Sequence, residues 1–136
     1  MTDEQVRRLA AQREELIATG WLTLTELAER RGEPDVGTVG GWVAARRLER
    51  ALIALDPRDG TIRVPAFQIT AGGDPRPELR PLLEVLLGAG IGGWAAWAWL
   101  TSPSSFLSGD VPEQVATTDP TRALNAATRF VQAVDA

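Results

Sequence analysis

Hydrophobic positions near the start of the chain recur at the spacing of an α-helix. A capping pair, Thr2 and Gln5, precedes them and Gly20 follows them, so the pattern predicts a first helix between Thr2 and Gly20. Its inner face consists of Val6, Leu9, Ala10, Leu16 and Ile17. The opposite face is charged, which indicates a solvated face or contact with a partner or a second copy.

Two shorter helices are predicted next, joined by a tight turn. Thr23 and Glu26 form a second capping pair ahead of a helix over about 24–31, with Leu22 and Leu27 spaced for a hydrophobic staple. Gly32 ends that helix, residues 33–35 form a turn, and 36–48 has the spacing of another helix.

A hairpin, or wing, is predicted after these helices. Residues 51–55 have the pattern of a strand, 56–60 that of a turn, and 61–64 that of a returning strand.

Glycines and prolines cluster between Thr70 and Pro77 and indicate a boundary. The sequence therefore predicts an N-terminal unit over 1–70, a linker over 71–76 and a helical unit over 77–136. Helices are expected over about 77–87, 91–100 and 111–117, with Asp110 as a cap. A last helix starts at Asp119 and Pro120 and runs almost to the C-terminus.

The amino-acid composition excludes several kinds of catalytic and metal-binding chemistry. The chain has 136 residues and a net charge of −4, and it lacks Cys, His and Tyr. It also lacks Lys, so every basic residue is Arg. Thiolate, imidazole, Schiff-base, P-loop and ordinary zinc chemistry are therefore absent, and the four serines in 102–108 have no usual activating base. We expect a binding protein, not an enzyme, with no metal and no cofactor.

Two patterns resemble a dinucleotide-binding motif and a membrane span, but we interpret neither as one. Residues 88–93 satisfy G-x-G-x-x-G, but leucines at helical spacing precede them where a dinucleotide site needs a strand. Residues 82–100 are almost apolar, yet glycines interrupt them, which favours two buried helices over a membrane span. Met1-Thr-Asp-Glu has no signal-peptide pattern, so cytoplasm is the expected location.

The two short helices and the wing form a pattern typical of DNA readers. Candidate contacts in this acidic chain are Arg30, Arg31, Thr38, Arg46, Arg47, Arg50 and Arg58. Gly40 and Gly41 weaken the second helix by about 1 kcal/mol each relative to Ala. Retention of the helices as a scaffold without DNA contact is the alternative.

The spacing of Trp94, Trp97 and Trp99 is too close for one helix face. Core packing is the simplest role for two of them, and the third is a candidate anchor for a partner.

The segment from Trp99-Leu100 through Pro103, Leu107 and Gly109 to Pro112-Glu113, followed by Asp119 and an Ala-rich helix, resembles the toxin-binding domain of Xre/MbcA/ParS-type antitoxins. The segment 64–68 is similar to one that closes a winged helix-turn-helix in some members. The resemblance covers about 21–136.

This resemblance implies a homodimeric antitoxin that binds its operator and occludes a RES-domain, NAD-degrading toxin. The partner contacts it suggests are Trp97, Trp99, Phe106 and Phe130. A stand-alone DNA-binding regulator or nucleoid-associated protein with a helical dimerisation domain is the alternative.

The fold expected from these observations is mainly α. It combines an N-terminal winged helix-turn-helix that has a small β-hairpin with a C-terminal four-helix bundle.

Overall fold

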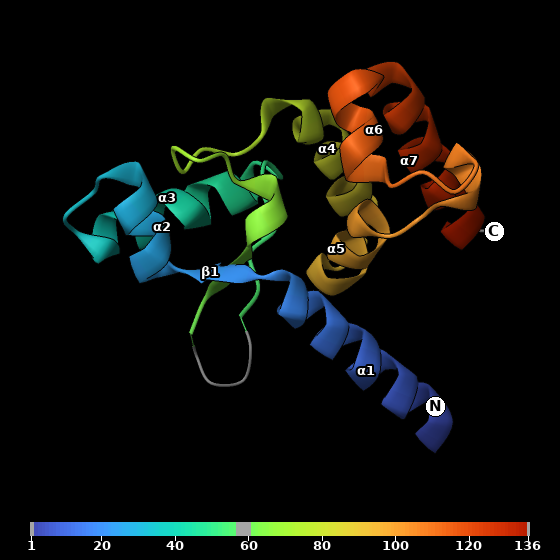
Figure 1. Ribbon diagram of the computed structural model, residues 1–136, viewed down its shortest axis with the longest axis horizontal. Helices are drawn as coiled ribbons and strands as arrows, with labels where there is room; N and C mark the ends of the chain where they lie inside the picture. Colours follow the sequence, from blue (N-terminus) through green and yellow to red (C-terminus); the bar gives the residue numbers. More distant parts are fainter. Residues whose placement is uncertain (1, 57–60, 136) are drawn as a thin grey trace.

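The computed structural model describes residues 2–56 and 61–135 and shows a mainly helical chain (Figure 1). The helices are α1 (Asp3–Thr19), α2 (Leu24–Arg31), α3 (Val36–Leu48), α4 (Arg80–Gly88), α5 (Gly93–Thr101), α6 (Pro112–Thr118) and α7 (Pro120–Asp135). A small antiparallel sheet pairs β1 (Trp21–Thr23) with β2 (Arg63–Pro65). Short 3-10 turns occur at η1 (Ala66–Gln68), η2 (Pro77–Leu79) and η3 (Ser105–Leu107).

The predicted helix starts and stops in the N-terminal part are confirmed. Thr2 and Thr23 each accept a hydrogen bond from the backbone N–H three residues on, and the Gln5 and Glu26 side chains complete two capping boxes. Gly32 ends α2 in the left-handed region at φ 67°, a conformation that glycine adopts without steric cost.

The predicted strand over 51–55 is wrong. The strand that pairs with β2 is β1. The first arm of the expected hairpin, 51–55, meets β2 at a single described bridge, Leu55 with Arg63. Instead, the buried side chain of Gln68 accepts a hydrogen bond from Ile53 N at 2.8 Å and donates one to Ile53 O at 2.7 Å. A side chain thus occupies the place of a neighbouring strand. The predicted turn residues Pro57, Arg58, Asp59 and Gly60 lie outside the described residues.

The apolar run over 51–55, which resembled a strand, has another cause. Residues 51–55 run extended between two hydrophobic cores and are buried on both sides. Leu52 and Ala54 belong to the core of α2, α3 and β2, whereas Ile53 and Leu55 belong to the core of α4–α7. This segment therefore joins the N-terminal and C-terminal halves by packing.

Residues 70–77, the expected linker region, contact both halves. Arg31 of α2 donates to the carbonyl of Gly73 at 3.0 Å and pairs with Asp74 at 2.9 Å. Arg76 donates to Glu78, to the Phe67 carbonyl and to Glu113 of α6. It also donates to Thr117, so all five guanidinium N–H groups have an acceptor.

Helices α4–α7 pack around leucines of α4 and α5 and alanines of α7. Asp119 caps α7 by accepting from Arg122 N at 3.2 Å, as predicted. Asp110 does not cap α6, because Val111 is the N-cap and the Asp110 carboxylate pairs with Arg122 at 3.2 Å.

The glycine-rich segment 88–93 connects two helices, α4 and α5, which is the context that the leucine spacing predicted. Within 2–56 and 61–135, no helix is both long and apolar enough to cross a membrane.

Candidate nucleic-acid interface

Helices α2 and α3 form a closely packed pair at one end of the molecule (Figure 1). Leu27, Val39 and Val43 fill the space between them and are fully buried or nearly so. A Cβ built on Gly40 would lie 3.5 Å from Leu24 of α2, so this glycine faces the helix crossing. A Cβ built on Gly41 would meet nothing within 4 Å, so Gly41 belongs to the outer face.

The outer face of α3 is made of small residues. Gly37, Thr38, Gly41 and Ala44 are exposed along it. Thr38 donates its hydroxyl to the Asp35 carboxylate at 2.9 Å. A face of this kind allows its backbone to approach another surface closely, but its first two turns offer few groups that distinguish one base from another.

Acidic side chains surround the N-terminal end of α3. Asp35 caps this end by accepting from Gly37 N at 3.0 Å, and Glu33 accepts from Asp35 N at 3.1 Å. A carboxylate thus occupies the helix N-terminus, where a phosphate would otherwise bind.

Glu26 performs the same capping task at α2. Hydrogen bonds from the backbone and then the side chain of Thr23 hold the pKa of this carboxyl below its usual value. Phosphate contacts are therefore expected away from these helix starts.

Two arginines of the predicted set are available near the other end of α3. Arg47 and Arg50 are exposed, and neither pairs with a carboxylate among the described residues. Arg30 of α2 is also exposed and reaches only the Thr70 carbonyl, at 3.5 Å. Among the described arginines of the predicted set, these three are exposed and pair with no described carboxylate.

The other predicted arginines are used within the chain or not described. The guanidinium of Arg31 lies 3.8 Å from the ring centroid of Trp42 and also pairs with Asp74. Arg46 pairs with Glu49 at 2.9 Å. Arg58 lies outside the described residues.

Arg50 has an unusual backbone. It follows α3 with φ 59°, the left-handed position that glycine normally fills at a helix end. Its N–H bonds to Arg47 O at 3.0 Å, and Ala51 N bonds to Arg46 O at 2.9 Å, which completes the turn. A non-glycine residue here costs about 1 kcal/mol, and such outliers concentrate at functional sites.

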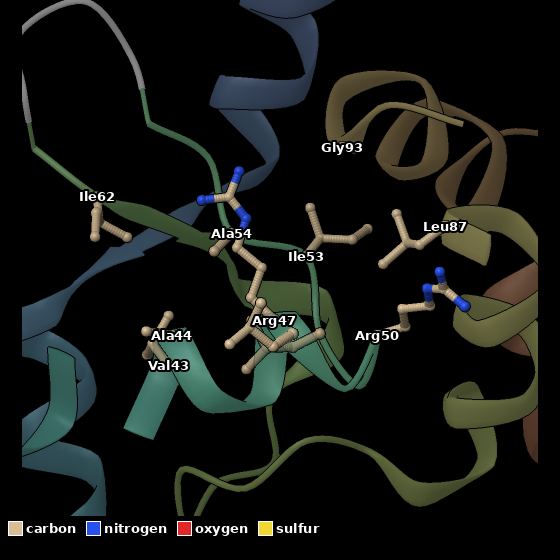
Figure 2. A pocket seen from close by; sticks show the side chains of 11 residues that line it. Val43, Ala44, Arg47, Arg50, Ile53, Ala54, Ile62, Leu87 and Gly93 are labelled. Atoms are coloured by element: carbon tan, nitrogen blue, oxygen red, sulfur yellow. The ribbon is translucent and has the colours of Figure 1, made fainter. Parts of the chain in front are cut away.

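Arg47 and Arg50 border a groove of about 650 Å³ between α3, the extended segment 52–54 and the α4–α5 connection. Figure 2 shows their side chains on either side of Ile53, with Arg50 directed toward Leu87. A Cβ built on Gly88 would lie 3.4 Å from Arg50 Nη1, so this guanidinium lies beside the end of α4. The described lining includes Ile62 and Gly93 and contains no acidic residue.

No sequence pattern indicates this groove. Its apolar lining comes from α3, from residue 62 and from α4, which are distant in the chain. Leu48, beside the arginines, is 87% exposed.

The aromatic residues predicted as partner contacts differ in their accessibility. The expectation for Trp97 is wrong, because this side chain is fully buried and stacks on Trp94 with ring centroids 5.6 Å apart. Trp99 and Phe130 are half-buried and stack at 5.2 Å. Phe106 is also half-buried, with Arg129 of α7 placed 5.1 Å from its ring centroid.

No family model and no curated protein sequence matches the chain. A solved structure resembles it, the NMR structure of Rv2175c, with a TM-score of 0.60 and 23% sequence identity over 82% of this chain and 81% of that chain. At this identity the likeness shows a shared fold and nothing about activity.

Proposed function

We propose that the protein binds duplex DNA through α2 and α3, which act as a helix-turn-helix, with the segment around β2 as a wing. The observation that supports this most directly is the position of Arg47 and Arg50. In a chain of net charge −4, both border a groove without described acidic lining, and neither pairs with a carboxylate among the described residues. Guanidinium groups placed in this way suit phosphate oxygens.

The same geometry favours modest sequence specificity. Between Gly37 and Ala44 the exposed residues of α3 are glycines, an alanine and one threonine that already bonds to Asp35. Phosphate contacts therefore supply most of the affinity, which gives binding that depends strongly on salt. A regulator or nucleoid-associated protein that reads DNA shape more than base edges fits these properties.

A pair of substitutions at Gly41 tests whether α3 faces the DNA. The site is open, so neither G41A nor G41E meets a steric barrier in the folded chain. We expect G41A to fold and bind duplex DNA within about threefold of the wild type, whereas G41E loses at least tenfold because its carboxylate faces phosphates. Fluorescence anisotropy with a labelled duplex at low salt measures both. Equal binding by G41A and G41E removes α3 from the interface.

A second function, the neutralisation of a RES-domain toxin, is favoured by a different surface. Trp99, Phe106 and Phe130 are half-buried on α5, η3 and α7, and aromatic side chains at a surface often anchor protein partners. Co-expression with the product of the adjacent gene tests it. A RES-domain neighbour that co-purifies with the wild type and with G41E, but not with F106D, supports this function. A neighbour of another kind, or one that does not co-purify, refutes it.

A further inference from the structure

The groove between α3, the extended segment 52–54 and the α4–α5 connection has the size of a small-molecule site. Its volume is about 650 Å³, and sites for small ligands enclose roughly 300–1,000 Å³. The lining is mostly apolar, as it is in such sites. Leu52 and Ile53 form its buried part, whereas Ala44 and Leu87 keep exposed surface. A molecule with an apolar body can therefore bind here.

The charges of this groove call for an anionic ligand. Arg47 and Arg50 line it, both are exposed, and neither forms a hydrogen bond through its guanidinium or an ion pair with a described residue. The described lining holds no acidic side chain that would balance the two positive charges. A carboxylate accepts two parallel hydrogen bonds from one guanidinium, which makes it a suitable partner for each of these arginines.

The positions of the two guanidinium groups define the shape of this ligand. Figure 2 shows them on either side of Ile53, with Arg50 directed toward Leu87. Arg50 also lies beside the end of α4, because a Cβ built on Gly88 would be 3.4 Å from its Nη1. A ligand with one carboxylate pairs with one arginine and leaves the other without a partner. A ligand with a carboxylate at each end pairs with both, and its middle then lies along the apolar lining.

We propose that this groove binds a linear dianion with an aliphatic middle, of the class of medium-chain α,ω-dicarboxylates. One carboxylate accepts hydrogen bonds from Arg47 and the other from Arg50, and the methylene groups contact the apolar lining that includes Leu87. Each methylene removed from water adds to the affinity. Binding of this ligand does not depend on DNA. A consequence, which rests on the proposed function, is that the dianion and duplex DNA compete for the same two arginines.

Isothermal titration calorimetry of the full chain with decanedioate tests the binding at low salt and pH 7, where both carboxyl groups are ionised. We expect a dissociation constant of roughly 10–100 µM. Two comparison ligands each lack one feature. Succinate keeps both charges without the long aliphatic middle, and decanoate keeps the chain with a single charge. We expect both to bind at least tenfold more weakly. No binding of decanedioate at about 1 mM, or equal affinity for either comparison ligand, overturns the proposal.

Substitution of each arginine tests whether both ends of the dianion are bound. We expect R47Q and R50Q each to lower the affinity for decanedioate to about that of the wild type for decanoate, because one carboxylate loses its partner. The matched control R129Q removes an exposed arginine of α7 that does not line the groove, and it leaves the affinity unchanged. Circular dichroism verifies the fold of each variant. Wild-type affinity in R47Q or in R50Q overturns the two-ended arrangement.

A second pair of variants places the ligand in the groove without changing either arginine. Ala44 is exposed and lines the groove, so A44E and A44Q add side chains of the same size there, one charged and one neutral. We expect A44E to bind decanedioate at least fivefold more weakly than A44Q, because its carboxylate repels the ligand or pairs with Arg47. Equal affinities overturn the assignment of the ligand to this groove.

Competition with DNA separates this inference from the proposed function. In fluorescence anisotropy with a labelled duplex, we expect saturating decanedioate to weaken DNA binding at least fivefold, whereas succinate at the same concentration supplies the control for ionic strength. A duplex that stays bound at saturating decanedioate overturns the placement of the dianion on Arg47 and Arg50. A wild-type chain that binds no duplex refutes the proposed function, and the calorimetric result then decides the dicarboxylate site alone.

Discussion

Replacement of Gln68 by leucine removes the hydrogen bonds that hold the extended segment 51–55 between the two cores. Gln68 is 1% exposed, and its amide satisfies both the N–H and the C=O of Ile53 at 2.8 and 2.7 Å. Leucine has a similar size but leaves two buried backbone groups without partners, at about 1–3 kcal/mol each. We expect Q68L to lower the free energy of unfolding by about 3 kcal/mol and the melting temperature by roughly 10 °C.

Urea unfolding followed by tryptophan fluorescence measures this loss as a lower midpoint with an unchanged slope. The variant Q68E supplies the control. Its carboxylate accepts from Ile53 N but has no proton for Ile53 O, and burial raises its pKa in the folded state. Its deficit is therefore largest near pH 7 and shrinks as the pH falls toward the pKa of an unfolded glutamate. A loss below about 0.5 kcal/mol for Q68L refutes the role assigned to this side chain.

Three further substitutions give expected outcomes in thermal or chemical unfolding. R76M is expected to lower the free energy of unfolding by about 2–4 kcal/mol, because Arg76 and Glu113 are only 19% and 17% exposed and form a multidentate pair. The control R80M removes an ion pair that is about half exposed, so it is expected to change stability by less than about 0.5 kcal/mol. Burial alone would lower the pKa of Arg76, but the Glu113 and Glu78 carboxylates outweigh burial and raise that pKa. A stability loss for R76M no larger than the loss for R80M refutes the stabilising role of this network. R50G relieves the left-handed strain and raises stability by about 0.5–1 kcal/mol while weakening DNA binding, so a lower stability for R50G argues against strain there. Because hydrogen bonds from Thr23 lower the pKa of Glu26, its contribution is present above the usual value of 4.5 and lost as pH falls through the lower folded value. E26Q keeps the hydrogen-bond acceptor but has no carboxyl group to titrate, so its stability should lack this pH dependence. If E26Q and the wild type unfold equally in acid, this role of Glu26 is wrong.

Local signals were sufficient for most of the helices. The capping boxes at Thr2 and Thr23 and the stop at Gly32 act through neighbouring backbone groups, so the sequence alone locates them. The strand over 51–55 was mispredicted because a segment buried between two cores has the same short apolar run as a fully buried strand. Its hydrogen-bond partner, Gln68, lies 15 residues away and has no local signature.

For the candidate site, the sequence predicted the type of residue but not which of these side chains are accessible. The sequence predicted a group of arginines on and around the two short helices, but it did not distinguish Arg47 and Arg50 from Arg31 and Arg46. That difference depends on Asp74, Glu49 and the Trp42 ring. Trp97 was assigned to a partner surface because helical spacing alone does not indicate which of several aromatic side chains the core encloses.

The salt dependence of DNA affinity, measured for the wild type and for R47Q/R50Q, tests whether Arg47 and Arg50 bind phosphates. Each arginine that neutralises a phosphate adds about 0.9 to the magnitude of the slope of log K against log salt concentration. With a short duplex and anisotropy at several salt concentrations, we expect a slope smaller by about 1.8 for the double variant and a lower affinity on every sequence tested. The matched control R129Q, on α7 beside Phe106, leaves the slope unchanged. A slope for R47Q/R50Q equal to that of the wild type contradicts the assignment of this face to DNA.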